Sequence, residues 1–271
     1  MAGAVVAFGR KTSTAVLMSL MFLSGCDREP SYRGVSFIAY NYTQFDLDSV
    51  SVTDESGKSA ATMQVSVGAG GGSVSCCYTL RGTEFTAQWR AYDPEILRNH
   101  LDDKDTDQYF FTKKKEVIFP PAEIPSGDAP LVLELHIYPD DHVEMALSRK
   151  MVNGRLPIVD TTRWLWRQHR DALGNFRDIY EVGHVIARVT KTSWGKYRIE
   201  DPADMREYMK MYFTVASNFD QDPVIKALLE KKDRQAGEFA RAIVALSRES
   251  IAALRLLGSP PGDKNREVSP E

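Results

Sequence analysis

The sequence predicts an α+β fold, with an N-terminal antiparallel sheet or sandwich and C-terminal helices packed on it. Three observations predict this class. Apolar and polar residues alternate with a period of two from Val35 to Ser148, which is the pattern of half-buried strands. After Asn153 the apolar residues recur at helical spacing. The chain contains no internal repeat, so neither half is built from repeated units.

Each expected strand places its apolar side chains on one face, as in an antiparallel sheet with one side toward solvent. The apolar positions are Val35, Phe37 and Ala39; Met63, Val65 and Val67; Val74, Cys76, Tyr78 and Leu80; and Phe85, Ala87, Trp89 and Ala91. The glycine-rich run 68–72 is expected to be a flexible hairpin loop. A phosphate-binding loop would also need a Lys-Ser/Thr pair and a following helix, and neither is present.

Residues 131–148 form a hairpin whose register can be predicted, with the turn at Pro139-Asp140-Asp141. This register pairs Ile137 with Val143, Leu135 with Met145, and Leu133 with Leu147. A slip of one residue would scatter these apolar pairs over both faces. The same register places His136 beside Glu144 on the other face, where we expect a surface ion pair. A metal there would need further ligands, and none is evident.

The helical half has recognisable start and stop signals. Asp160 is the expected N-cap of a helix carrying Trp164, Leu165 and Trp166, with Gly174 near its end. Residues 176–189 have helical spacing, although their valines also permit a strand. Asp201-Pro202 and Asp222-Pro223 each combine an N-cap with proline at the first helical position. Apolar residues at helical spacing follow both, until Gly258 and Pro260 stop the pattern. We expect these apolar stripes to form core.

The N-terminus has the organisation of a bacterial lipoprotein signal peptide. Arg10 and Lys11 precede an uncharged, mostly apolar run, 12–23, which is too short to span a bilayer. Ser24 and Gly25 then lead directly to Cys26. We therefore expect cleavage between Gly25 and Cys26 and acylation of the Cys26 thiol, which would anchor the mature chain to a membrane. The alternative is an ordinary signal peptide with a chance cysteine.

These assignments divide the chain into a signal peptide (1–25), a tether (26–33), a β domain (34–150), a helical region (151–257) and a disordered tail (258–271). The mature chain is expected to face the periplasm. Asp27 favours retention at the inner membrane, and the outer membrane stays open. The mature chain has 32 Lys and Arg against 37 Asp and Glu, a net charge of −5. This balance argues against nucleic acid as a partner.

Cys76 and Cys77 are adjacent, and in a regular strand their side chains would point to opposite faces. Neighbouring Cα atoms lie about 3.8 Å apart, below the usual range for a disulfide. We therefore expect both to be structural thiols. Cys76 is predicted to be reduced and buried against Val74 and Tyr78. A strained disulfide between the two is the alternative.

The usual catalytic motifs are missing from the sequence. It contains no Gly-x-Ser-x-Gly, His-Glu-x-x-His, Walker or Cys-x-x-Cys motif, and its five histidines are not at ligand spacing. We expect no enzymatic activity, cofactor or metal. The remaining catalytic alternative is a set of side chains outside these motifs, such as Glu134, His136 and Glu144. The acidic run 102–107 lacks the glycine and closing carboxylate of a calcium loop, so we expect a solvated segment. A weak cation site and an interaction patch are the alternatives.

Four features resemble a known family: Tyr40-Asn41-Tyr42-Thr43, Gly70-Gly71-Gly72, Cys76-Cys77 and Trp89. Together they resemble a bacterial domain of unknown function, found in lipoproteins encoded beside lipase effectors of type VI secretion systems. The likeness covers residues 33–150 and the signal peptide. Where that family often has proline and another tryptophan after the cysteines, this chain has Arg81-Gly82-Thr83.

The resemblance implies an immunity lipoprotein that binds a toxic phospholipase in the periplasm and blocks it without chemistry of its own. Its partners would be the cognate lipase and, through the Cys26 lipid, the membrane. The contact residues are unknown, and aromatic candidates for anchors are Tyr92, Tyr109, Phe110 and Trp194. The alternative function is a structural or envelope-assembly lipoprotein that binds components of the cell envelope.

Overall fold

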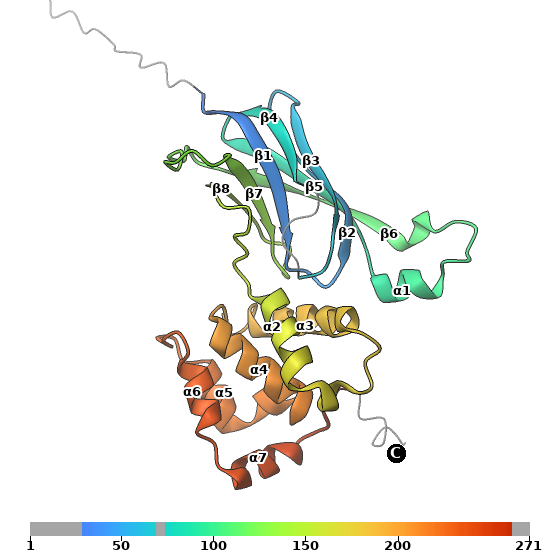
Figure 1. Ribbon diagram of the computed structural model, residues 1–271, viewed down its shortest axis with the longest axis vertical. Coiled ribbons are helices and arrows are strands. Elements are labelled where there is room, and N and C mark those ends of the chain that lie inside the picture. Colours follow the sequence, from blue (N-terminus) through green and yellow to red (C-terminus); the bar gives the residue numbers. More distant parts are fainter. Residues whose placement is uncertain (1–28, 69–73, 262–271) are drawn as a thin grey trace, which may run out of the picture.

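The computed structural model describes residues 29–68 and 74–261, and it has the α+β class that the sequence predicts (Figure 1). Two four-stranded sheets lie face to face in the N-terminal part, drawn in blue and green. The helices α2 to α7, in yellow to red, follow below them. Gly25, Cys26 and loop residues 69–73 lie outside the described residues, as does most of the predicted tail.

The first sheet has the strand order β4-β1-β7-β8. Its strands are β1 (Ser31–Asn41), β4 (Ser75–Arg81), β7 (Val132–Ile137) and β8 (Val143–Ser148). The central pair, β1 and β7, is parallel, whereas the sequence predicts only antiparallel strands. Nearly all residues of β1 from Val35 onward and all of β7 are buried, as expected for parallel strands covered on both faces.

The second sheet is antiparallel throughout and has the order β3-β2-β5-β6. Its strands are β2 (Asp46–Asp54), β3 (Ser59–Val65), β5 (Glu84–Tyr92) and β6 (Phe110–Ile118). Apolar side chains from both sheets, among them Phe37, Trp89 and Leu133, fill the space between them. Trp89 and the alternating residues of β5 therefore form core, as their period of two predicts.

Three details of the strands bear on the prediction: one agrees with it and two differ. All three predicted apolar pairs of the 131–148 hairpin are present, so its register is confirmed. Strand β1 begins at Ser31, so the last residues of the predicted tether belong to the sheet. Met63, predicted on the buried face of β3, is exposed, because the left-handed backbone at Gln64 (φ 56°) reverses the alternation before Val65.

The helical half consists of six α-helices with short connections. They are α2 (Ile158–Gln168), α3 (Ile179–Ser193), α4 (Pro202–Thr214), α5 (Pro223–Leu229), α6 (Glu238–Val244) and α7 (Arg248–Arg255). The helical stretch expected after Asp222 is thus divided into three helices. Gly237, with φ 70°, precedes α6, and Ser247 caps α7.

The aspartate-proline start signals are confirmed. Asp201 accepts hydrogen bonds from the first backbone amides of α4, and Asp222 does the same for α5. Asp160 is not an N-cap, because α2 already begins at Ile158 and Asp160 lies in its first turn. The valine-rich segment is a helix, α3, and Asp178 caps it by accepting from the Glu181 amide at 2.9 Å.

The helices lie at one end of the sandwich, below it in Figure 1. Ile38, Tyr40 and Tyr42 of β1 and its extension belong to the same hydrophobic cluster as the helical core. Gly68, just after β3, lies close to Ile158 at the start of α2. A Cβ there would lie 2.3 Å from Ile158 Cγ2 at the start of α2, so only glycine fits. The strand half and the helical half are therefore joined by a continuous apolar interface.

Candidate functional site

A buried polar network lies at the junction between the two halves. The side chains of Glu134 and His136, both on β7, are fully buried. His136 Nε2 lies 3.1 Å from Glu134 Oε2, and His136 Nδ1 lies 2.9 Å from the Tyr42 hydroxyl. Glu134 also accepts hydrogen bonds from the Ser148 hydroxyl and from Asn153 Nδ2. Every polar atom of this Glu-His pair thus has a partner within the protein.

The chemistry of the partners fixes the protonation of the network. A carboxylate only accepts, so His136 Nε2 donates to Glu134, and the neutral ring accepts the Tyr42 hydroxyl proton at Nδ1. Burial lowers the pKa of His136, although its bond to Glu134 acts in the opposite direction. Burial alone would raise the pKa of Glu134, but its three side-chain hydrogen bonds hold it below its usual value. The pair is therefore a neutral imidazole beside a carboxylate.

The surface ion pair predicted between His136 and Glu144 is wrong. The two residues are opposite one another in the register, as predicted, but the chain after β8 covers this face. The backbone amides of Asn153 and Arg155 donate to the hydroxyls of Tyr40 and Tyr42, at 2.9 and 2.8 Å. Glu144 instead binds His142, Arg155 and the Tyr138 hydroxyl.

In the catalytic alternative built on Glu134, His136 and Glu144, the first two side chains are inaccessible, and only Glu144 is exposed. Glu134 and His136 are sealed beneath the connection 149–157, and their hydrogen bonds hold that connection in place. The network sets how the helices follow the sandwich, and a substrate has no path to it among the described residues.

The predicted aromatic anchors divide into two groups. Trp194 is only 4% exposed and stacks on Tyr138 at 4.7 Å, so it is core and not an anchor. Tyr92, Tyr109 and Phe110 are half-buried and lie where β5 and β6 continue into a long connection, residues 93–109. We call this connection the β5–β6 arm. In Figure 1 it stands away from the sandwich and contains helix α1 (Pro94–Asn99).

Several contacts brace the base of the arm. The Arg90 guanidinium lies 3.9 Å from the centre of the Phe110 ring, and it pairs with Asp48 at 3.1 Å and with Asp107 at 2.8 Å. The rings of Tyr92 and Phe110 meet at 5.0 Å. These contacts tie both ends of the arm to the second sheet.

Further contacts hold the body of the arm. Asp93 caps α1, and Glu95 on that helix pairs with Arg188 of α3 at 3.5 Å. His100 stacks on Tyr109 at 4.7 Å, and the Tyr109 hydroxyl donates to Asp103. The arm is thus a structured surface element that touches both halves of the molecule.

The exposed surface of the arm is acidic with apolar side chains in it. It contains six acidic and two basic residues. Ile96 and Leu101 are 49% and 65% exposed. Asp103, Asp105 and Asp107 do not converge on one point: they bind Tyr109, the Asp107 amide and Arg90, respectively. Among the residues that the structure describes, no group of three His, Cys, Asp or Glu side chains could hold a metal.

Sequence reasoning missed Ile96, the helix α1 that carries it, and Leu101, which follows that helix. A usable signal was present, because Asp93-Pro94 repeats the cap-and-proline pattern of Asp201-Pro202 and Asp222-Pro223. The short helix was hidden by the strand pattern on either side of it.

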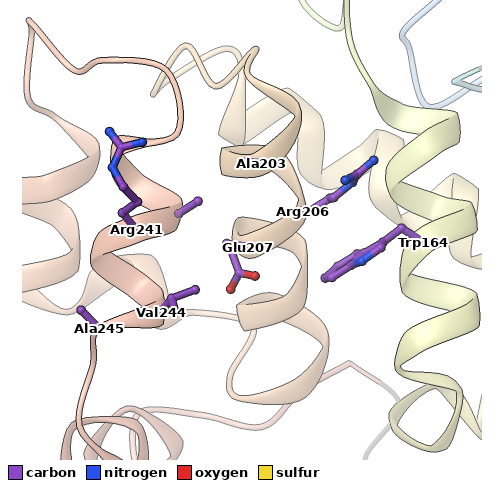
Figure 2. A pocket seen from close by; sticks show the side chains of 8 residues that line it. Trp164, Ala203, Arg206, Glu207, Arg241, Val244 and Ala245 are labelled. Atoms are coloured by element: carbon purple, nitrogen blue, oxygen red, sulfur yellow. The ribbon is translucent and has the colours of Figure 1, made fainter.

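Two further hollows lie on the described surface. A cleft of about 520 Å³ lies where the sandwich meets α2 and α3, lined by Asp46, Arg98, Ile158, Tyr180 and His184 among others. A groove of about 500 Å³ lies between α2, α4 and α6 (Figure 2). In it Trp164 and Arg206 lie in the space between α2 and α4. Its described lining residues include no histidine, cysteine or serine, so it offers no nucleophile or base of these types.

Cys76 and Cys77 are both free, and both are exposed. The prediction of a buried Cys76 packed with Val74 and Tyr78 is therefore wrong, and Val74 is itself exposed. The physical reason is the backbone: Cys77 has φ 73°, which breaks the alternation of a regular strand.

Comparisons with known proteins identify no family. No family model matches the chain, and no curated protein matches it. An NMR structure of a protein from Eubacterium rectale aligns over 45% of this chain and 94% of its own, at 11% identity and a TM-score of 0.21. A likeness at this level carries no argument. Within the described part of the chain, the helices are too short or too polar to cross a bilayer.

Proposed function

We propose that this chain is an immunity lipoprotein that binds a secreted lipase of a type VI system and neutralises it by occlusion. In this proposal Cys26 carries the lipid that holds the protein at a periplasm-facing membrane surface. The observation that carries the proposal is the β5–β6 arm, a braced surface element that exposes Ile96 and Leu101.

The chemistry of the arm suits a protein partner. Exposed apolar side chains on an ordered element can anchor an interface, and bracing lowers the entropy lost on binding. The acidic residues around them favour a partner with a basic rim, because complementary charge speeds and orients association. We assign this surface to contact with the lipase, next to its active-site entrance or its lipid-binding face.

The buried network supports inhibition by contact instead of by chemistry. Glu134 and His136 form an acid–histidine pair of a kind that many active sites use. Here the pair has no solvent exposure, and each of its side-chain polar atoms is already hydrogen-bonded. Its contribution is to the architecture that presents the arm.

A lipid anchor would add to this function. A phospholipase acts at the membrane surface, so an inhibitor held on that surface has a high effective concentration where damage begins. Loss of the anchor should therefore weaken protection of the cell more than it weakens binding in solution.

The test is growth of cells that export a type VI lipase whose gene is found next to the gene for this chain. Co-expression of the full chain should restore growth. The Cys26→Ala chain should rescue less well while it still inhibits the purified lipase. An arm variant, Ile96→Asp with Leu101→Asp, should fail both to rescue and to inhibit.

The matched control places the same charges elsewhere. Met151 and Val224 are 51% and 65% exposed, so Met151→Asp with Val224→Asp reproduces the change at equal exposure outside the arm. This control should protect as well as the native chain. Absence of rescue by the native chain, together with absence of binding to the lipase, would contradict the proposed function.

A further inference from the structure

The first sheet contains an irregularity at Cys76 and Cys77. Phe37 of β1 pairs with Ser75 of β4, and Val35 pairs with Tyr78. One residue of β1, Ser36, therefore lies opposite the two cysteines, which is the arrangement of a β-bulge. Strand β4 is at the edge of its sheet, so only one of its sides pairs with a strand of that sheet.

The backbone at this bulge is in a conformation that cysteine rarely adopts. Cys77 has φ 73°, in the left-handed region where glycine is usual and other L-residues are strained. Strained residues of this kind concentrate at functional sites, so the outlier itself calls for a functional explanation. A glycine at this position would make the same bulge without strain.

The two thiols are together and accessible. Cysteine is among the residue types most often buried, but both side chains here are exposed. In a regular strand they would point to opposite faces. The bulge instead breaks this alternation, and the neighbouring Cys77 thiol raises the pKa of the Cys76 thiol.

We propose that Cys76 and Cys77 form a reversible dithiol–disulfide site that exchanges with small-molecule disulfides of the glutathione type. One cysteine loses its proton, and its sulfur attacks the disulfide. A mixed disulfide forms, and one thiol leaves with that proton. The second cysteine sulfur then attacks the first, its proton passing to the second leaving thiol. Two cysteine thiols are oxidised to one disulfide, and one small disulfide is reduced to two thiols.

A disulfide between Cys76 and Cys77 can form without disrupting the pairing of β1 with β4. The ladder between β1 and β4 is made by Ser75 and Tyr78 on either side of the pair, and neither cysteine has a partner in that register. Adjacent Cα atoms are about 3.8 Å apart, below the usual range for a disulfide, so the bond is strained. Strained, exposed disulfides are easily reduced, which makes this one suited to exchange and not to a permanent crosslink.

The test uses the full chain and a second full chain with Cys26→Ser, which removes the third cysteine. Each is reduced, freed of reductant and equilibrated with oxidised glutathione. After digestion, the peptide that contains residues 76 and 77 should lose two hydrogens and regain them with dithiothreitol. The reduced protein should bind one phenylarsine oxide through both thiols, because this probe requires two neighbouring sulfurs.

Single variants provide the control. Cys76→Ser and Cys77→Ser should each lose the internal disulfide completely and instead retain one glutathione as a mixed disulfide. Circular dichroism checks that both variants stay folded. The proposal is overturned if both thiols remain open to alkylation in excess oxidised glutathione, or if the native pair stops at the mixed disulfide. These measurements need no lipase, so they stand apart from the proposed function.

Discussion

The buried Glu134–His136 network and the exposed β5–β6 arm contain similar residue types in opposite settings. In the network an acid, a histidine and tyrosine hydroxyls are sealed from solvent and fully hydrogen-bonded. In the arm the acids Asp103 and Asp107 and the histidine His100 form their contacts at the surface, beside exposed Ile96 and Leu101. Burial decides which set contributes to stability, and exposure decides which set is free to meet a partner.

The largest expected effect lies in the network. Glu134→Ala would leave the donors of His136, Ser148 and Asn153 without their acceptor, so it should lower the free energy of unfolding by about 3–5 kcal/mol. Glu144→Ala, on the same hairpin but with a side chain 41% exposed, should cost about 1 kcal/mol or less. Denaturant unfolding measures both. Equal losses would contradict the distinction between buried and exposed carboxylates.

The hydroxyls of Tyr42 and Tyr40 test how far the network holds the connection 149–157. Tyr42→Phe removes a hydroxyl with two partners, His136 Nδ1 and the Arg155 amide, and should cost about 2–3 kcal/mol. Tyr40→Phe removes a hydroxyl bonded to the Asn153 amide and should cost about 1 kcal/mol. Thermal and denaturant unfolding test the ranking, and a reversed order would show that the network does not hold the connection 149–157.

Acidification should weaken the network. His136 and Glu134 both have folded-state pKa values below their ordinary 6.5 and 4.5, so the unfolded chain binds more protons as pH falls. The stability from His136 is complete above pH 6.5 and declines below it, and that from Glu134 declines below pH 4.5. His136→Gln should reduce the slope of unfolding free energy against pH by up to about 1.4 kcal/mol per unit.

The bulge in β4 predicts a smaller change in the free energy of unfolding, and here one substitution should stabilise the protein. Cys77→Gly should stabilise the reduced protein by up to about 1 kcal/mol, because relief of left-handed strain exceeds the entropy cost of glycine. Cys76→Gly brings no such relief and should destabilise by about 0.5–1 kcal/mol. Unfolding in the presence of reductant measures both. Destabilisation by both would show that Cys77 is not strained.

The smallest effect on stability is expected in the arm. Ile96→Asp with Leu101→Asp changes exposed side chains and should alter the free energy of unfolding by about 0.5 kcal/mol or less. A larger loss in denaturant unfolding would mean that these residues support the fold and are not available to a partner.

Local sequence patterns predict much of this fold. The period of two in β5, the apolar pairs of the β7–β8 hairpin and the aspartate-proline caps of α4 and α5 all depend on neighbouring residues, and all are present. The parallel pairing of β1 with β7 is not predictable in this way, because it joins strands that are distant in the chain.

Each error has a physical cause that a local sequence pattern does not contain. Placing His136 at the surface assumed that one face of the hairpin meets water, but the connection 149–157 bonds to the tyrosines that surround His136 on that face. Placing Cys76 and Met63 in the core assumed unbroken alternation, which left-handed backbone at Cys77 and Gln64 interrupts. The arm was missed because a six-residue helix leaves little periodicity.

The most direct test of the account is the affinity of the full chain for a type VI lipase whose gene is found next to its own, measured by calorimetry. The native chain and the Met151→Asp, Val224→Asp control should bind equally tightly, and Ile96→Asp with Leu101→Asp should weaken binding by roughly 100-fold or more, about 3 kcal/mol. Equal affinity of all three chains would remove the arm from the interface, and absence of binding by the native chain would contradict inhibition by contact.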